Sequence, residues 1–377
     1  MFWYLLNIFL ILSVALWPMD RNTVSRVSTN HITYARNNMT AKRICIVGTL
    51  NWIVLSGFRH YSVGNDTYAY RDYHFMKTMG TDWSVILRNF YLKYAEGLEV
   101  KDPGYTILEK TFQIFTDNYT MWLIAIASFF FILMGRKIYK YSASPTLSYV
   151  LFSTLFYSFF AITGHRQTIA TGIAVFIGSE MILRRKLLPF LLIVAIASTI
   201  HASAICFLPF YWLSQLKINK ITLCIYWCGI ILSFTFRNQF MVLLQRMVGY
   251  ESYGFSDSAA AGNFMFLMFA IAVFFTVFYQ SIMQKVTKYF STDVIKMIEM
   301  SCNAVFIACI FMSLLLINPA FMRVVQYYSI FLLILLPVFQ FLFTPASRKI
   351  FNGVCIAVMI ILLIRTHPFY YFVWQKL

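Results

Sequence analysis

The chain has 377 residues, of which 60% are hydrophobic, 19% are aromatic and only 12% are charged. A soluble domain carries about 25% charged residues, so this composition excludes a water-soluble globule. The formal net charge of +17 does not indicate nucleic-acid binding, because most basic residues stand at the ends of apolar runs and not in one patch.

The apolar residues occur in runs separated by short basic clusters, which is typical of membrane-spanning helices. We predict an all-α polytopic membrane protein with a single transmembrane domain over residues 1–377. About twelve transmembrane helices are expected, at 2–18, 44–58, 119–135, 145–163, 168–183, 187–200, 202–216, 221–236, 262–283, 297–317, 324–343 and 350–364.

Three arrangements fit the segment 187–216: one long helix, two short helices meeting at His201, or a re-entrant hairpin. Basic residues flank both outer ends, and a polar break runs from Thr199 to Ser203. Two short helices therefore fit best, because a single span would reverse the side on which every later loop lies.

The connections between spans divide into a basic set and a mixed set. The alternate connections 19–43, 136–144, 184–186, 217–220, 284–296 and 344–349 hold 18 Lys and Arg against two acidic residues. Short basic loops stay in the cytoplasm. Both termini are therefore predicted to be extracytoplasmic, as is the long loop 59–118.

Within that loop, the apolar residues of Asp82–Ala95 fall on one helical face, which predicts an amphipathic helix along the membrane interface. A second helical stretch is predicted to begin at Pro103-Gly104.

Polar residues from separate parts of the chain are predicted to meet at the outer face. Ionisable residues at membrane depth are costly and tend to mark substrate paths. The candidates are Arg59, Asp66, Tyr68, Tyr70, Asp102, Tyr105, Arg166, Gln167, His201 and Arg323.

These residue types suit a lipid-linked sugar diphosphate. Guanidinium groups bind phosphate oxygens at two points, a carboxylate or imidazole accepts a proton from a hydroxyl, and tyrosines pack against sugar rings. Each also has a purely structural interpretation: Arg59 and Arg323 as residues that reach the headgroups, His201 as a packing residue, and Asp66 as a helix cap. No histidine or cysteine spacing indicates a metal site.

Several short motifs appear in one order along the chain. They are Arg59 with VGNDTYAY at 63–70, DPGY at 102–105, Arg166-Gln167 with Ala170, His201 with Ser203-Ala204, and Arg323 with Tyr327. In this order and spacing the chain resembles the EpsG-like branch of Wzy-type polysaccharide polymerases, over about residues 50–330.

The resemblance implies a GT-C-like glycosyltransferase fold and metal-independent polymerisation of undecaprenyl-diphosphate-linked oligosaccharide repeat units, without a cofactor, at the outer face of the bacterial cytoplasmic membrane. It implies that Arg59, Arg166 and Arg323 hold the diphosphate, and that Asp66 or His201 is the general base, with Asp66 slightly favoured. Tyr68, Tyr70 and Tyr105 would shape the sugar subsites, and Asp102 and Gln167 would also bind substrate. A chain-length regulator and a flippase of the same pathway are the implied protein partners.

Two other functions use similar residues. A ligase would move finished glycan from the same lipid carrier to a different acceptor, and a flippase or transporter would carry the lipid-linked glycan across the bilayer. A membrane-bound O-acyltransferase is a third alternative, through His201.

Overall fold

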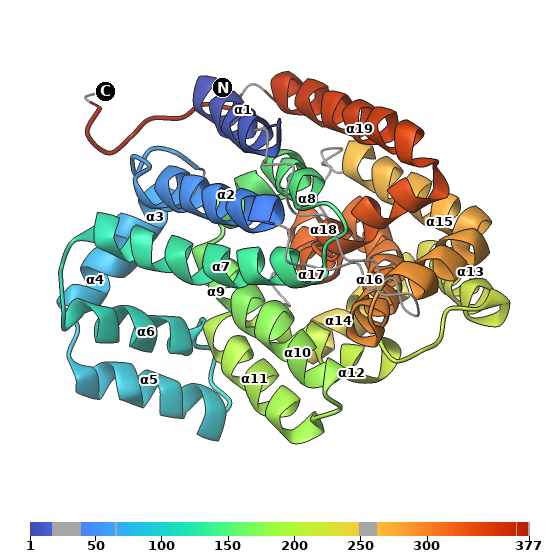
Figure 1. Ribbon diagram of the computed structural model, residues 1–377. Coiled ribbons are helices and arrows are strands. Elements are labelled where there is room, and N and C mark those ends of the chain that lie inside the picture. Colours follow the sequence, from blue (N-terminus) through green and yellow to red (C-terminus); the bar gives the residue numbers. More distant parts are fainter. Residues whose placement is uncertain (17–38, 65, 249–261, 367, 376–377) are drawn as a thin grey trace.

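The computed structural model describes residues 1–16, 39–64, 66–248, 262–366 and 368–375 (Figure 1). Within these ranges the fold is helical, and the one strand-like pairing is an isolated antiparallel bridge between Arg59 and Phe372. Asn65 of the VGNDTYAY motif and most of the predicted cytoplasmic loop 19–43 lie outside the described residues.

Two helices precede the long loop, and five short helical elements form it. The first two are α1 (Phe2–Leu16) and α2 (Met39–Gly57). The loop contains α3 (Thr67–Ala69), the π-helix η1 (Tyr70–Phe75), α4 (Met76–Met79), α5 (Trp83–Ala95) and α6 (Pro103–Gln113). Figure 1 shows α5 and α6 side by side at one edge of the molecule, with α6 between α7 and α5.

The central segment is helical with several changes of pitch. It contains α7 (Tyr119–Tyr141), α8 (Pro145–Leu151), the π-helices η2 (Phe152–Phe156) and η3 (Ser158–Thr163), α9 (His165–Thr171), the π-helix η4 (Gly172–Ile177) and α10 (Gly178–Leu183). After it come α11 (Leu187–Ile200), the 3₁₀-helix η5 (Ala202–Phe207) and α12 (Phe210–Leu213). π-Helices are rare and often mark functional sites. Here η3 precedes α9 along the chain and η4 follows it.

The remaining described part of the chain is also helical, in long helices joined by short ones. They are α13 (Lys220–Thr235), α14 (Arg237–Val248), α15 (Gly262–Tyr289), α16 (Thr292–Phe311), η6 (Met312–Leu316), η7 (Pro319–Phe321), α17 (Met322–Ser329), α18 (Leu332–Leu335), η8 (Leu336–Leu342) and α19 (Pro345–Arg365).

The predicted class, an all-helical polytopic membrane protein, agrees with helix length and surface chemistry. Among the residues that the structure describes, four helices are long and apolar enough to cross a membrane, at 119–141, 262–289, 292–316 and 345–365. Two bent pairs raise the number to six, one bent by 92° after Thr235 and the other by 41° after Ser329. Twelve crossings, and which loops are cytoplasmic, stay predictions.

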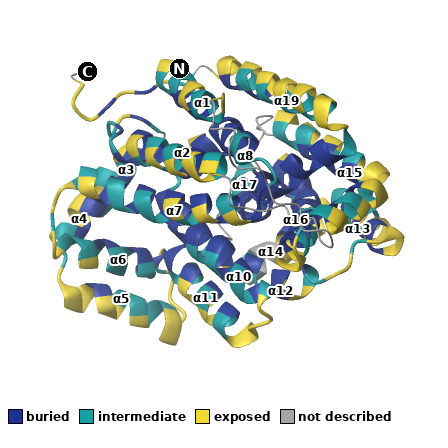
Figure 2. Cartoon of the chain, viewed as in Figure 1, coloured by how far each residue is buried: buried dark blue, intermediate teal, exposed yellow. Residues whose placement is uncertain are grey.

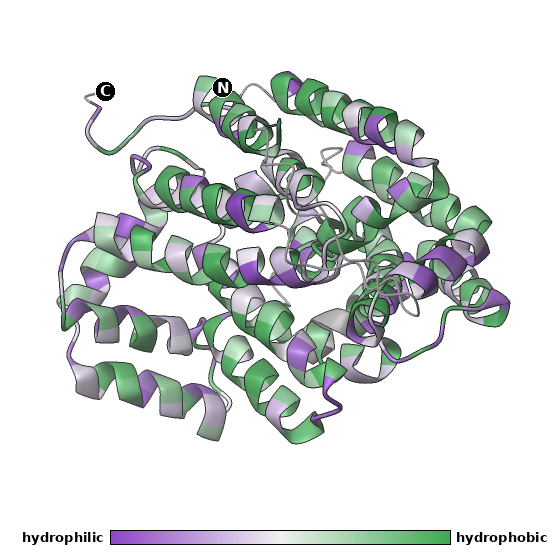
Figure 3. Cartoon of the chain, in the orientation of Figure 1, coloured by the Kyte–Doolittle hydropathy of each residue, from purple (hydrophilic) through white to green (hydrophobic). Residues whose placement is uncertain are grey.

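The exposed apolar face of α19 indicates contact with lipid. Large apolar side chains of α19 are exposed at Ile350, Val354, Val358 and Ile361, which share one helical face. In Figure 3 the ribbons of α19 and α15 are mostly green, which marks apolar residues. In water such a contiguous apolar surface would drive association, whereas in a bilayer hydrocarbon covers it.

Every predicted span overlaps a helical segment, and the segment 187–216 is interrupted at His201. There α11 ends at Ile200, His201 adopts an extended conformation (φ −152°, ψ 111°), and η5 begins at Ala202. One continuous helix over this segment is therefore excluded, and the break brings the His201 side chain next to the long loop.

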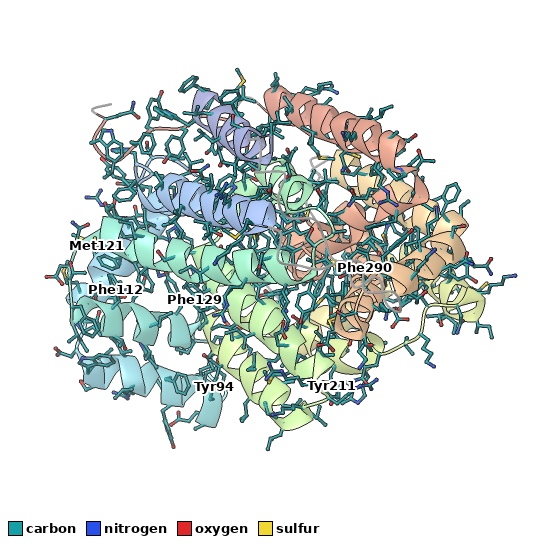
Figure 4. All side chains as sticks on the ribbon, in the orientation of Figure 1. Tyr94, Phe112, Met121, Phe129, Tyr211 and Phe290 are labelled. Carbon is teal, nitrogen blue, oxygen red and sulfur yellow. The ribbon has the colours of Figure 1, made fainter. Side chains whose placement is uncertain are left out.

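Buried residues form two cores. The larger core is centred on α8, α16 and α17 and is dark blue in Figure 2. The smaller core joins the long loop to α7, α9 and α11, and its buried members are Tyr70, Phe75, Tyr105, Trp122, Ile126, Ile169 and Ile200. Phe112 of α6 and Phe129 of α7, labelled in Figure 4, pack against it. The loop is thus packed onto the helices that follow it.

A buried charge pair joins α7 to α10. Lys137 Nζ lies 2.8 Å from Glu180 Oε1 and donates to Ser179 Oγ at 2.8 Å. Lys140 and the Tyr141 hydroxyl contact Oε2 of the same carboxylate, both at 3.1 Å. The Lys137 side chain is 8% exposed and that of Lys140 is 49% exposed. Only the buried Lys137 ammonium therefore needs the Glu180 carboxylate as its counter-charge.

We expect Glu180→Gln to destabilise the protein by roughly 2–3 kcal/mol, because it leaves the buried Lys137 ammonium without a counter-charge. Lys140→Gln, which removes an exposed partner of the same carboxylate, should cost less than about 1 kcal/mol. Thermal unfolding of both variants in one detergent measures the difference. Equal losses of stability would show that burial of Lys137 is not the source of the effect.

Candidate active site

The centre of the site is the carboxylate of Asp102, which is 4% exposed. Arg166 Nη1 donates to its Oδ2 at 2.8 Å, the Ala202 N–H donates to Oδ1 at 3.1 Å, and His201 Nδ1 lies 3.3 Å from Oδ2. Burial opposes ionisation of Asp102, but the hydrogen bond with His201, the charge of Arg166 and the hydrogen bond from the Ala202 N–H together lower its pKa to about 2. The carboxylate is therefore ionised at neutral pH.

The backbone at Asp102 is unusual and is held by its surroundings. Its φ of 45° and ψ of 54° lie in the left-handed region, which is uncommon for residues other than glycine. The next residue, Pro103, opens α6 at a position where its fixed φ suits a helix start. Gly104 then lies against α11, since an added Cβ would come within 2.3 Å of Thr199 Oγ1. DPGY thus docks α6 closely against the helix break.

Arg166 connects Asp102 to the start of the long loop. Its Nε lies 3.3 Å from the Tyr70 hydroxyl and its Nη2 lies 3.2 Å from His74 Nε2. Its guanidinium carbon is 5.2 Å from the ring centre of Tyr70 and 5.7 Å from that of Tyr105. The site therefore holds this cation with a carboxylate, an imidazole and two aromatic faces.

The π-helix η1 places Tyr70 and His74 next to each other, with ring centres 5.6 Å apart. Burial, and then the charge of Arg166, lower the pKa of His74 to about 4. Its imidazole is therefore neutral at physiological pH and can accept the hydrogen bond from Arg166.

Arg59 contacts Tyr70 and Arg166 only indirectly, through His165. Its Nη2 is 2.7 Å from His165 Nε2, and its Nη1 donates to the Ser56 carbonyl. The His165 ring stacks on Tyr70, with centres 4.3 Å apart and planes at 20°. Arg59 thus supports Tyr70 through His165, and through Tyr70 it supports Arg166.

A cavity of about 270 Å³ lies in front of these groups. Its wall comes from the long loop, the turn before α9, the break at His201 and the start of α17. The lining residues are Asp66, Ala69, Tyr70, His74, Lys101, Asp102, Phe159, Thr163, Gly164, Arg166, Gln167, His201 and Arg323. Three cationic side chains thus face two carboxylates and two histidines.

The candidate residues divide into two groups. Seven line the cavity: Asp66, Tyr70, Asp102, Arg166, Gln167, His201 and Arg323. Three do not: Arg59 and Tyr105 are buried behind it, and Tyr68 is 51% exposed, with Tyr61 and Tyr73 as ring neighbours. The Tyr105 hydroxyl lies 3.4 Å from Trp122 Nε1, so this tyrosine belongs to the smaller core.

Two candidate bases differ in their surroundings. The Asp66 side chain is exposed and makes no capping hydrogen bond at α3, so the cap interpretation does not account for it. His201 is buried, and because its Nδ1 faces the Asp102 carboxylate, that nitrogen carries the proton and Nε2 is the basic atom. Nε2 has no hydrogen-bond partner among the described residues.

Arg323 reaches the cavity from the opposite side. Gln167 Nε2 donates to the Arg323 carbonyl oxygen, and the Tyr327 hydroxyl, one turn later, lies 3.3 Å from Ser203 Oγ. The residues of the HxSA and RQ motifs therefore fix the start of α17 against the helix break.

His74 and Lys101 line the cavity but were not among the sequence candidates. Lys101 directly precedes the DPGY motif, and His74 stands four residues after Tyr70. Both positions could have been noted, since a residue next to a candidate, or one helical turn from it, shares its surroundings. In the described part of the chain, no three His, Cys, Asp or Glu side chains are grouped as metal ligands.

The fold and this cavity define a polytopic helical membrane protein with a charged site between its long loop and the ends of its helices. The chain belongs to the EpsG family, whose model matches residues 42–375, so the resemblance is confirmed. Membership indicates a glycosyltransferase-like polymerase acting on polysaccharide. No curated protein and no solved structure matches the chain, and the GT-C-like arrangement stays a prediction.

We expect Gly104→Ala to disturb the site, because the added methyl group meets Thr199 and pushes α6 away from the break. Overpacking of this kind typically costs about 1–3 kcal/mol, and it should also reduce polymer formation. Gly353→Ala is the matched control, since a Cβ at that position of α19 meets nothing within 4 Å. Thermal unfolding and polymer length, measured for both variants, test the prediction. Wild-type behaviour of Gly104→Ala would contradict the close contact.

The buried Glu109 carboxyl of the long loop should make the stability of the protein depend on pH. Burial raises its pKa from an ordinary 4.5 to about 8, against smaller opposing contributions from hydrogen bonds with Tyr105 and Thr78. Between these two values the folded protein keeps a proton that the unfolded chain loses, so stability should fall as pH rises from about 5 to 8. Glu109→Gln keeps the shape without the proton and should flatten this decline, by roughly a few kcal/mol across the range.

Thermal unfolding of wild type and Glu109→Gln at pH 5, 6.5 and 8 measures the effect. Glu96→Gln is a suitable control, because Glu96 is an exposed residue of the same loop. Parallel pH profiles for wild type and Glu109→Gln would show that Glu109 ionises normally.

Proposed function

We propose that this protein polymerises undecaprenyl-diphosphate-linked oligosaccharide repeat units at the outer face of the bacterial cytoplasmic membrane. The observation that carries the proposal is the cavity in which three cationic side chains lie beside an Asp102–His201 pair. The cations suit a diphosphate, and the pair suits removal of a proton from a sugar hydroxyl. Family membership supports the same class of reaction.

In the proposed step, a hydroxyl oxygen of the acceptor sugar bonds to the anomeric carbon of the donor glycan. The bond from that carbon to the diphosphate oxygen breaks, and the electron pair leaves with undecaprenyl diphosphate. The hydroxyl proton passes to a base of the protein. The growing chain is thereby transferred from its own lipid carrier to the end of another lipid-linked unit.

We assign the base role to His201, with Asp102 as its positioning residue. Asp102 holds the Nδ1–H tautomer, leaving Nε2 to accept the proton, and its negative charge stabilises the imidazolium that forms. Asp66 was slightly favoured on sequence grounds because a carboxylate is already ionised at neutral pH. It lines the cavity, and among the described residues no hydrogen bond orients its side chain as Asp102 orients His201, so we assign it to binding the acceptor sugar.

The cations take different roles in this proposal. Lys101 and Arg323 neutralise the diphosphate as it leaves, which is electrostatic stabilisation by groups already in place. Arg166 is already paired with Asp102, so the principal role of Arg166 is to hold that carboxylate. The part of the guanidinium charge that Asp102 does not neutralise is directed to the cavity. Arg59 is a positioning residue that supports Tyr70 and Arg166 from behind.

We expect His201→Gln to abolish long glycan chains and leave single-repeat products, because glutamine cannot take up the proton. Asp66→Asn, which keeps the shape and hydrogen bonding of the side chain, should shorten the chains without abolishing them. The measurement is glycan length on a gel after complementation of a polymerase-deleted host that carries the native glycan genes. Membrane insertion of each variant is confirmed in parallel.

His60→Gln and Asp72→Asn are the matched controls, since both residues belong to the long loop and neither lines the cavity. Loss of polymer in Asp66→Asn with retention in His201→Gln would reverse the assignment of the base. Purified protein given only the lipid-linked repeat unit should yield a ladder of products. A requirement for a second acceptor would identify a ligase instead.

A further inference from the structure

An apolar groove runs along the outside of α2 and α7, away from the cavity. It is lined by Lys42, Cys45, Ile46, Thr49, Leu50, Ile132, Gly135, Arg136 and Tyr139, and its volume is about 350 Å³. Ile46, Leu50 and Ile132 are each about half exposed, at 48%, 55% and 47%. No described part of the chain covers these side chains, and their exposed apolar surface suits contact with lipid.

The shape of the groove follows from the close packing of its two helices. An added Cβ at Gly135 would come within 2.2 Å of Thr49 Oγ1 and 2.9 Å of the Tyr149 hydroxyl. The Thr49 hydroxyl lies 2.8 Å from that of Tyr149, so the polar groups at the floor are satisfied. α2 and α7 therefore meet closely at this point and leave a dry, apolar channel between their outer flanks.

Both cations of the groove lie towards the same end. Lys42 stands near the start of α2 and Arg136 near the end of α7, and both are exposed. Neither forms an ion pair with a carboxylate of the described residues. From Lys42 to Leu50 the helix rises about 12 Å, which accommodates much of an acyl chain.

This cationic end is opposite to the end of α2 that adjoins the cavity. Arg59 follows α2 directly, whereas Lys42 is in its first turn. About 22 Å of helix separates Lys42 from Gly57. The groove is therefore a separate feature, and the proposed glycosyl transfer does not require it.

We propose that this groove binds a phospholipid with an anionic headgroup, at the end of α2 opposite to the cavity. The headgroup phosphate contacts Lys42 and Arg136, and one acyl chain lies against Ile46, Leu50 and Ile132. Charge complementarity selects the anionic headgroup, because basic sites between membrane helices attract anionic lipids. The exposed apolar side chains that line the groove select a lipid over a soluble phosphate.

The test is native mass spectrometry of the full-length protein in a neutral detergent. It is titrated with dioleoyl phosphatidylglycerol or with dioleoyl phosphatidylcholine, which differ only in the headgroup. We expect the first phosphatidylglycerol to bind about tenfold more tightly than phosphatidylcholine. The double variant Lys42→Gln/Arg136→Gln should bring the two affinities to the same value.

The matched control is Lys220→Gln/Lys349→Gln, which removes the same charge from exposed positions of α13 and α19. It should bind phosphatidylglycerol like the wild type. Equal affinities of the wild type for the two lipids, or equal losses in the two double variants, would overturn the proposal. Because lipid binding and not activity is measured, the result is independent of the proposed polymerase reaction.

Discussion

The site depends on one buried carboxylate. Asp102 comes from the long loop, yet its three donors belong to the start of α9 and to the break after α11. A buried ion pair gives little net stability, but removing one partner leaves a buried charge that costs roughly 3–5 kcal/mol. Asp102 and Arg166 therefore require each other, and together they fix the loop to the helices that carry the rest of the site.

The same pair decides how the positive charge of the site is divided. The guanidinium of Arg166 is already matched by Asp102, and Arg59 stands one layer behind, against His165. Lys101 and Arg323 are thus the lining cations whose charge is directed least towards Asp102. A diphosphate would meet a cavity with a small excess of positive charge.

The sequence predicted the helical membrane class and the family, because composition, apolar runs and motif order do not depend on side-chain geometry. It also predicted the break at His201 from the polar residues between two apolar runs. Seven of the ten candidate residues line one cavity, since ionisable groups at helix ends of a membrane protein gather where they avoid hydrocarbon.

The sequence could not predict which candidate residues line the cavity and which support the lining residues from behind. Arg59, Arg166 and Arg323 look alike as single arginines near apolar runs, and only packing separates a buried support from a lining residue. Asp102 was assigned to substrate binding because nothing in DPGY reveals its left-handed backbone or its three donors. The length of the spans was equally hidden, since several short apolar helices do not show by length alone whether they cross the bilayer.

The break at His201 and the site are one feature of the fold. A helix that stops in apolar surroundings exposes backbone groups, and each unsatisfied group costs several kcal/mol. Here the His201 N–H still bonds to the Ala197 carbonyl at 2.9 Å, and the first free N–H of the next segment, that of Ala202, donates to Asp102. The carboxylate that orients the His201 imidazole therefore also satisfies the interrupted backbone. Replacing Asp102 removes both functions at once, so the interruption is tolerated only where the long loop delivers this carboxylate.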